Sequence, residues 1–564
     1  MPQVGWPEKF KQWRWPLLVG LAGWLAVLAT RDHPGITSDE PFNVQYGKDF
    51  VSKWRAHGAE FFTPNVVSET FSTRHEHPPL GRWAIGWVHR LQNWTARAED
   101  FSIQDILDAR AAPATAFALM LVLLTRVVAS RHGTAAGVTA GLCLLLMPRS
   151  FGHAHFAALD TFMSFTYMTG ILSAAWMMES RRPWLSAPLA GVLLGLAFLT
   201  KIHAVFLLPI VGIWVLVFYR IRGIPALALW FLSGLEIFYA GWPWLWDDLD
   251  AFWSSIRQGI FSQPGWFLRL PQVFSRFTSF LGTSVERDAI FVTYLGRDYR
   301  DIFVPWHYPW VLFAVTVPVG IHVLGVLGVW QTFRSACREP RNWLYLAALA
   351  FPMLVFSVPR VPVYDGVRMF LMVFPFWAAF AGRGAGFLYE WLSSRWQPRW
   401  ATVALAGCLG CQAIGVCYYQ PFQLSYYNLL VGGLRGANRL GFEVTYWGDS
   451  VNQDLLDRWS SLAPRNACAV LVPNLYVGQS DLYGSPGIRE KNQRISGAPN
   501  SSCQYLLVYN RRAYFGDTRQ FIDDPGQRVL VENVVDGVWI SRVYVQKPPQ
   551  TAGSNESLSD LNER

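Results

Sequence analysis

Long apolar stretches recur through the first three-quarters of this 564-residue chain, and most of them are bounded by Trp, Tyr or Arg. Charged residues make up only 15% of the chain, whereas they make up about 25% of a typical soluble protein. A run of roughly 20 apolar residues crosses a bilayer as a helix, and aromatic and basic residues mark the ends of such helices. The sequence therefore predicts a polytopic α-helical membrane protein.

The apolar stretches predict about 11 transmembrane helices, because several short cores must include flanking aromatic residues to reach the length of a span. We expect the spans to begin at Leu17, Ala111, Ala135, Phe156, Leu185, Ala204, Ile224, Trp306, Trp343, Met369 and Trp400. The first span follows basic residues and has no clear cleavage site between small residues. We interpret it as an uncleaved signal anchor.

Basic residues are grouped in alternate connections between these spans. The groups are Lys9, Lys11 and Arg14; Arg126 and Arg131; Arg181 and Arg182; Arg220 and Arg222; Arg334, Arg338 and Arg341; and Arg395 and Arg399. Cytoplasmic loops carry such an excess of Lys and Arg, so we expect a cytoplasmic N-terminus and, with an odd number of spans, an external C-terminal region. The formal charge of +9 is not gathered on one face or in runs, so we expect no nucleic-acid partner.

The expected external segments differ in kind. Two long loops, at roughly residues 30–110 and 243–305, mix aromatic and polar residues, as do short helices that lie in the membrane interface. From residue 420 the composition changes to one segment with helical spacing and several strand-like segments, the last of which contains an Asp-Gly turn. We therefore predict a transmembrane domain over 1–419, an external α/β domain over 420–547, and a disordered tail over 548–564. Cys468 and Cys503 could pair in an oxidising compartment.

The polar residues that could carry chemistry fall on the expected outer face. They are Asp39 and Glu40, Glu76 and His77, Arg149 and Asp160, Lys201, and Arg368 with its neighbour Asp365. Isolated cations are unexpected in outside loops, but they suit a site that neutralises a phosphate while a carboxylate accepts a proton. This pattern favours an enzyme that joins an anionic lipid donor to a hydroxyl or amine acceptor.

Each of these residues also has a simpler interpretation. Thr37 or Ser38 followed by acids is typical of a helix start, and Lys201 could extend from the end of a span toward the interface. The run from His75 to His77 lacks the spacing of a metal-binding helix, so we predict no metal. Gly191 and Gly195 are spaced for helix packing.

Three stretches resemble motifs of the GT-C membrane glycosyltransferases, in particular protein O-mannosyltransferases and lipid A aminoarabinose transferases. They are "SDEPFNV" (38–44), "HEHPPLGRW" (75–83) and "LTKIHAVFLLP" (199–209), and the similarity covers roughly residues 10–400. One position departs from the aminoarabinose enzymes, which have Lys where this chain has His77. The identity of the donor sugar therefore cannot be inferred from that family. The stretch 423–450 resembles a tail of uncharacterised bacterial members without an assigned role.

The resemblance implies a GT-C fold and an inverting transfer of a sugar from a polyprenyl-phosphate donor, with no cofactor other than this co-substrate. It implies that Asp39 is the catalytic base with Glu40 beside it, that Glu76 and His77 line the donor pocket, and that Lys201 contacts the lipid phosphate. Arg149, Asp160 and Arg368 are further donor-binding candidates. We expect a protein, lipid or glycan acceptor at the outer face of a bacterial inner membrane. The alternatives are a transporter or a lipid-handling protein without transferase activity, and a receptor.

Overall fold

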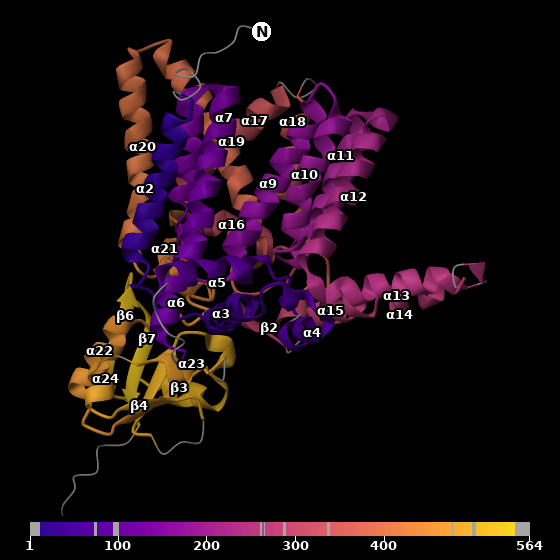
Figure 1. The fold of residues 1–564 in the computed structure, drawn as a ribbon. Helices are drawn as coiled ribbons and strands as arrows, with labels where there is room; N and C mark the ends of the chain where they lie inside the picture. The colour runs from indigo at the N-terminus through magenta and orange to yellow at the C-terminus, as the bar shows by residue number, and fades with distance from the viewer. Residues whose placement is uncertain are drawn as a thin grey trace, which may run out of the picture.

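The computed structural model of the protein describes residues 12–72, 76–93, 101–259, 262–263, 265–285, 289–334, 339–475, 478–484, 486–498 and 503–546. Lys9, Lys11, His75, Arg338 and the predicted tail 548–564 lie outside these ranges. Figure 1 shows three layers: a bundle of long helices, short helices lying across one end of it, and a sheet domain beyond them.

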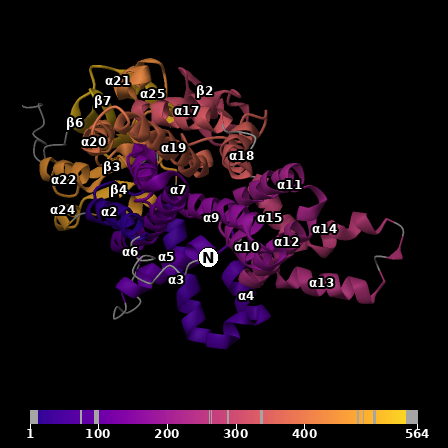
Figure 2. The ribbon, with the colours of Figure 1, turned by 90° about the horizontal axis from the view of Figure 1, so that it is seen from above.

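The bundle consists of helices that form at the predicted apolar stretches. They are α2 (Arg14–Thr30), α7 (Ala111–Leu145), α9 (Leu159–Glu179), α10 (Pro183–Phe198), α11 (Leu207–Phe218), α12 (Ile224–Gly241), α16 (Tyr308–Thr316), α17 (Val319–Arg334), α18 (Pro340–Val355), α19 (Phe374–Ser393) and α20 (Pro398–Tyr418). Seen from above, they stand side by side, while α13 and α14 project from one side of the bundle (Figure 2).

Helix α7 contains two of the predicted spans. Gly133 has φ 84° inside it, and a Cβ on Gly137 would lie 2.4 Å from the Cβ of Ala129. These residues would be about 12 Å apart along a continuous helix. The chain therefore folds back at Gly133, and the two halves of α7 run antiparallel, in agreement with separate spans that begin at Ala111 and Ala135.

The predicted number of membrane spans is not confirmed. Among the described residues, four helical stretches are long and apolar enough to cross a membrane: Ile103–Leu145, Arg220–Gly241, Arg368–Ser393 and Pro398–Tyr418. Helices α16 and α17, bent by 114°, would make a fifth as a broken span. Helices of 16 or 17 residues, such as α2 and α10, are about 25 Å long, which is shorter than the roughly 30 Å of a hydrocarbon core.

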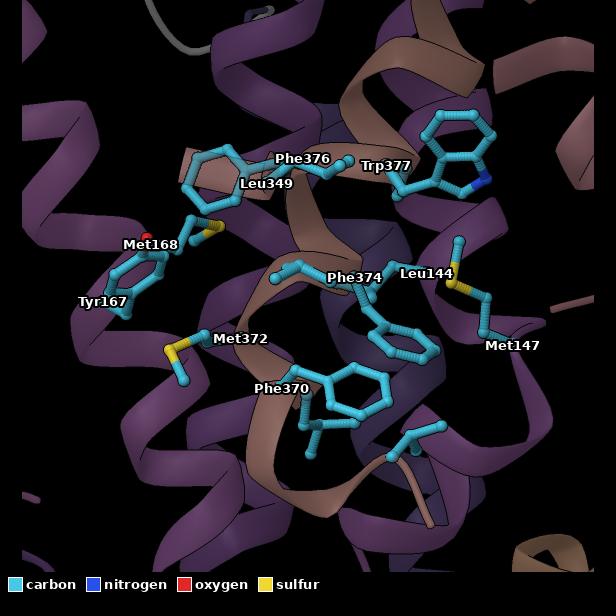
Figure 3. Close-up of a cluster of buried hydrophobic side chains, with 14 of the residues drawn as sticks. Leu144, Met147, Tyr167, Met168, Leu349, Phe370, Met372, Phe374, Phe376 and Trp377 are labelled. Carbon is cyan, nitrogen blue, oxygen red and sulfur yellow. The ribbon is translucent and has the colours of Figure 1, made fainter. Parts of the chain in front are cut away.

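The centre of the bundle is filled by large apolar side chains, most of them from α7, α9, α18, α19 and the 3-10 segment η8 (Arg368–Val373) that precedes α19 (Figure 3). Elsewhere glycines let helices approach closely, as membrane helices commonly do. A Cβ on Gly191 would lie 2.6 Å from the carbonyl oxygen of Trp230, and one on Gly195 would lie 2.7 Å from that of Gly234. The predicted packing role of Gly191 and Gly195 is thus confirmed between α10 and α12.

The second layer, here called the cross helices, comes from the two long loops that were expected to form short helices. Its members are α3 (Glu40–His57), α4 (Pro64–Phe71), α5 (Leu80–Gln92), α6 (Ile103–Ala109), α13 (Trp246–Arg257), α14 (Leu270–Val273) and α15 (Ser275–Val285). Helices α3 and α5 touch at Gly47, where an added Cβ would lie 2.4 Å from the carbonyl oxygen of Arg82. This contact brings the start of α3 close to the loop before α5.

The sheet domain begins with α22 (Gln453–Leu462) and contains five strands in the order β4-β3-β5-β7-β6. The strands are β3 (Cys468–Val472), β4 (Arg494–Ser496), β5 (Tyr505–Tyr509), β6 (Val529–Val535) and β7 (Val538–Val545). Strands β4, β3 and β5 are parallel, and β7 is antiparallel to its neighbours. The predicted hairpin turn is confirmed, with φ 51° at Asp536 and φ 69° at Gly537. Cys468 and Cys503 form a disulfide.

A buried connector, residues 441–450, links the three layers. The N–H of Gly35 donates to the carbonyl oxygen of Asp449 (2.7 Å), and the N–H of Ser38 donates to that of Trp447 (3.2 Å). The Ser541 hydroxyl of β7 donates to the carbonyl oxygen of Ser450 (2.7 Å). The connector therefore ties the start of the cross helices to the sheet. It belongs to the stretch for which the sequence suggested no role.

Candidate active site

A cavity of about 1250 Å³ lies where the three layers meet. Its wall includes Asp39, Asn43, Tyr46, Glu76, His77 and Arg82 from the cross helices and their loops; Lys201, Val205, Phe206, Phe356, Asp365 and Arg368 from the end of the bundle; and Leu471, Asn474, Arg511, Tyr514, Phe515, Asp517 and Thr518 from the sheet domain. Five of the eight predicted site residues line it: Asp39, Glu76, His77, Lys201 and Arg368.

Asp39 is one of four carboxylates among the residues that line this cavity, with Glu76, Asp365 and Asp517. It precedes the first residue of α3 and makes no side-chain cap bond, so the helix starts where the sequence indicates but Asp39 does not cap it. Its side chain is 30% exposed, and Oδ2 accepts a hydrogen bond from Arg368. Oδ1 lies 3.4 Å from Nε1 of Trp447. Asp39 is therefore held in place while part of its carboxylate stays accessible.

Glu40 has the opposite environment. It is fully buried, and both of its oxygens accept from Arg110 at 2.8 Å. The backbone N–H groups of Thr37 (2.9 Å) and Ala157 (3.0 Å) also donate to it. Glu40 does not line the cavity, so its contacts are those of a structural ion pair and do not support the predicted place in a catalytic pair.

Arg368 and Lys201 are joined through Asp160. The Nε of Arg368 donates to Asp160 (2.9 Å), and its Nη1 donates to Asp365 (3.1 Å). The Nζ of Lys201 donates to the other oxygen of Asp160 (2.7 Å). Because Asp160 lies behind the cavity wall, it holds both cations without occupying the space between them and Asp39. Lys201 is buried in this pair and does not extend toward the membrane interface.

Glu76 and His77 line the cavity from the loop before α5, in the same layer as Asp39. Oε1 of Glu76 accepts from Nη2 of Arg82 at 2.5 Å. Burial of the imidazole lowers the pKa of His77 well below its usual value, and the positive charges of Arg82, Lys201 and Arg368 lower it further. The imidazole is therefore neutral at physiological pH. Among the described residues, no three His, Cys, Asp or Glu side chains are grouped to hold a metal ion.

Arg149 is not brought to the cavity, contrary to expectation. Its guanidinium lies over the ring of Tyr427 at 4.7 Å, and its Nε donates to the carbonyl oxygen of Tyr426 (3.2 Å). It lies in α8 (Pro148–His153), beside the segment that follows α20. The rings of Tyr427 and of Tyr446 in the connector lie 4.7 and 5.9 Å from the guanidinium, and Arg149 does not line the cavity.

Three residues connected with the predicted site were not predicted from the sequence: Arg82 and Arg511, which line the cavity, and Trp447, which is fully buried and is not part of its wall. Arg82 stands in the same motif as Glu76 and pairs with it, so the motif itself could have indicated it. Arg511 and Trp447 come from the C-terminal region, more than 400 positions after Asp39. No local pattern connects them with the first external loop.

Residues 71–246 match the family model described as dolichyl-phosphate-mannose-protein mannosyltransferase. Comparison with curated proteins gave no match. Among solved structures, the chain is similar to ArnT from Cupriavidus metallidurans bound to undecaprenyl phosphate, with 16% identity and a TM-score of 0.49 over 96% of this chain and 98% of that one. For the apo form of that protein the identity is 14% and the TM-score 0.48, over 94% of this chain and 97% of that one.

The archaeal oligosaccharyltransferase AglB from Archaeoglobus fulgidus, in complex with an inhibitory peptide and a dolichol-phosphate, is also similar. The identity is 11% and the TM-score 0.43, over 90% of this chain and 70% of that one. The family match itself spans His77, Asp160 and Lys201. Over residues 71–246 the chain thus carries the pattern of the dolichyl-phosphate-mannose-protein mannosyltransferases, which confirms the resemblance to GT-C membrane glycosyltransferases predicted from the sequence motifs.

Proposed function

We propose that the protein is an inverting glycosyltransferase that moves a sugar from a polyprenyl-phosphate donor to a hydroxyl or amine acceptor. The observation that carries the proposal is the cavity in which the Asp39 carboxylate lies beside two cations, Arg368 and Lys201. Cations that contact a phosphate stabilise the charge that develops as it leaves, and a carboxylate can accept the proton of the attacking group.

The reaction has two bond changes at one carbon. The acceptor oxygen or nitrogen attacks the anomeric carbon as the bond from that carbon to the phosphate oxygen breaks, and the bonding electrons leave with the phosphate. The acceptor proton passes to Asp39. Attack from the side opposite the leaving phosphate inverts the anomeric carbon. No step requires a metal, because Lys201 and Arg368 supply the positive charge.

Donor binding would change the partner of Arg368. Without donor, Oδ2 of Asp39 accepts from Arg368. The bound donor is a phosphodiester with one negative charge, and its phosphoryl oxygens can compete with Asp39 for the guanidinium. The polyprenyl phosphate that leaves is a monoester with more negative charge, so its attraction for Arg368 grows as the bond breaks. Transfer of the Nη2 hydrogen bond from Asp39 to the phosphate would release Oδ2, while the contacts of Arg368 with Asp160, Asp365 and Trp447 keep the guanidinium beside Asp39. The base would then become available only when the donor is bound.

The cavity wall also suits a lipid carrier. On the bundle side it includes Val205, Phe206, Val355, Phe356 and Val361, and Val205 is 46% exposed. This apolar strip borders the cation pair, as a polyprenyl chain attached to a phosphate would require. A transporter would instead place ionisable residues along the middle of its spans.

We place the cavity at the outer face of a bacterial inner membrane, with the N-terminus in the cytoplasm and the sheet domain outside. Two observations support this orientation. Disulfides persist in oxidising compartments, and the sheet domain contains one. Arg131 and Arg341, from predicted cytoplasmic connections, pair with Glu179 at the end of α9, about 29 Å along the helix from Asp160.

The test uses the full chain in nanodiscs with a panel of tritiated undecaprenyl-phosphate sugars and an extract of the cell envelope as acceptor. Transfer of label to protein, glycan or a second lipid supports the proposal and identifies both substrates. In sealed proteoliposomes, uptake of label without transfer would establish the transporter alternative instead. Failure of the whole panel, with neither transfer nor uptake, would also count against the proposed function.

A further inference from the structure

We propose that Trp447 and Arg511, both from the C-terminal region, are positioning residues that hold Arg368 against Asp39. The C-terminal region is then a part of the catalytic apparatus and not an attached binding module. This inference rests on the proposed function, because it takes Asp39 to be the base.

Trp447 contacts both members of the Asp39–Arg368 pair. It lies in the buried connector and is fully buried. The Arg368 guanidinium lies over its ring, 4.4 Å from the centroid, and its Nε1 lies 3.4 Å from Oδ1 of Asp39. One side chain therefore sets the plane of the cation and limits rotation of the carboxylate. The backbone of the same residue accepts the N–H of Ser38, which fixes the residue before the base.

Arg511 reaches the pair through Asp365. It follows β5, its side chain is 2% exposed, and its Nη2 donates to Oδ1 of Asp365 at 2.8 Å. The other oxygen of Asp365 accepts from Nη1 of Arg368 at 3.1 Å. Nη1 of Arg511 donates to the carbonyl oxygen of Tyr446 in the connector. The two cations thus share one carboxylate, which keeps Asp365 from moving away from Arg368.

The backbone of Asp365 is held in an uncommon conformation. Its φ is 55°, in the left-handed region that residues other than Gly rarely adopt. Such a conformation persists when the surrounding contacts fix it. Arg511 is the residue of the sheet domain that contacts the Asp365 side chain. Without it, Asp365 would be free to relax, and Arg368 would lose one of the three carboxylates that orient its planar fork.

The first test compares two buried tryptophans in the C-terminal region. Trp447→Phe keeps an aromatic ring under Arg368 but removes the N–H, and Trp459→Phe makes the same change at an equally buried site in α22 that packs on Tyr505. A small misplacement of reacting groups costs up to about 100-fold, so we expect kcat per folded molecule to fall about 10- to 100-fold for Trp447→Phe. Trp459→Phe should retain the wild-type kcat. Equal losses in both variants would overturn the inference.

The second test asks whether the loss acts through the base. In an Asp39→Asn background there is no base to position, so adding Trp447→Phe or Arg511→Lys should lower the remaining rate less than about two-fold, because residues that act as a unit are not additive. Arg511→Lys alone should lower kcat, and Arg542→Lys, which alters the Glu532 pair elsewhere in the sheet, should not. Full additivity with Asp39→Asn would show a purely structural role.

A third test does not depend on enzymatic activity. A double-mutant cycle of Asp365→Asn and Arg511→Lys, read as Tm of the detergent-solubilised chain, measures whether the two residues interact. Coupling with no transfer from any donor would leave the contact network supported and remove the proposed function. Absence of coupling would overturn the inference whether or not the protein is a transferase.

Discussion

The Glu40–Arg110 pair and the Arg368 network are ion-pair clusters around neighbouring carboxylates, and they differ in whether the carboxylate stays accessible. In the first, Arg110 and two backbone N–H groups satisfy both Glu40 oxygens, and water does not reach them. In the second, Arg368 is shared among Asp39, Asp160 and Asp365, and the Asp39 carboxylate remains partly exposed to the cavity. Burial and the number of donors around each side chain therefore distinguish the structural carboxylate of Glu40 from the partly exposed carboxylate of Asp39, to which we assign the chemical role.

The largest expected effect is on turnover when Asp39 is replaced. Asp39→Asn keeps the shape of the side chain but removes the proton acceptor, and base catalysis contributes about 10²- to 10⁴-fold. We expect kcat to fall by that order, while the solubilised protein stays monodisperse with a Tm close to that of the wild type. Normal turnover in this folded variant would show that Asp39 is not the base and would leave both carboxylates with structural roles.

The reciprocal change should act on stability. Glu40→Gln leaves Arg110 buried without its ion partner, and breaking a buried pair costs about 3–5 kcal/mol. We expect poor expression or a large fall in Tm, with nearly normal activity in the fraction that folds. Both quantities can be measured on the same size-exclusion peak. A stable but inactive Glu40→Gln variant would instead return Glu40 to the catalytic pair.

Lys201 should affect the donor more than the fold. Lys201→Ala removes one cation from the cavity, and a hydrogen bond to a charged group contributes about 1.5–3 kcal/mol, so the donor KM should rise at least about ten-fold. The control is Lys48→Ala, which breaks a Lys–Asp pair of similar length, 2.6 Å to Asp105, outside the cavity wall. Equal donor kinetics in both variants would show that Lys201 only stabilises Asp160.

A smaller effect is expected in the pH dependence of stability. Burial raises the pKa of Glu443 from 4.5 to about 8. Between these values the folded chain holds a proton that the unfolded chain has lost, so stability falls as the pH rises through this window. Glu443→Gln cannot lose that proton, and its Tm should decline less than that of the wild type from about pH 5 to about pH 9. Parallel Tm curves for the two proteins would show that Glu443 is already ionised.

Chelation should have the least effect. Because Arg368 and Lys201 provide the charge at the cavity, exhaustive treatment with a chelator should leave the transfer rate unchanged. Activity that disappears and is restored by a single divalent ion would contradict this, and Asp39, Glu76 and His77 would become candidate ligands.

Much of the local structure could be predicted from the sequence. Each apolar stretch forms a helix, or two helices in the stretch that begins at Trp306, because a run of apolar residues is a local property. The turn at Asp536 and Gly537 is equally local, since an Asp-Gly pair adopts positive φ at low cost. Whether each helix is long enough to span a membrane could not be predicted in the same way, because caps and kinks such as the one at Gly133 decide where a helix ends.

The sequence by itself predicted one group of polar residues on the expected outer face: Asp39, Glu40, Glu76, His77, Arg149, Asp160, Lys201 and Arg368. It could not separate Asp39 from Glu40, or place Arg368 in the cavity and Arg149 outside it. Those outcomes depend on contacts between residues hundreds of positions apart, such as Arg368 with Asp39. Only the packing of the sheet domain and its connector against the bundle brings Trp447 to Asp39 and Arg511 to Asp365. Side-chain exposure and ion pairing are set by tertiary neighbours and not by local sequence.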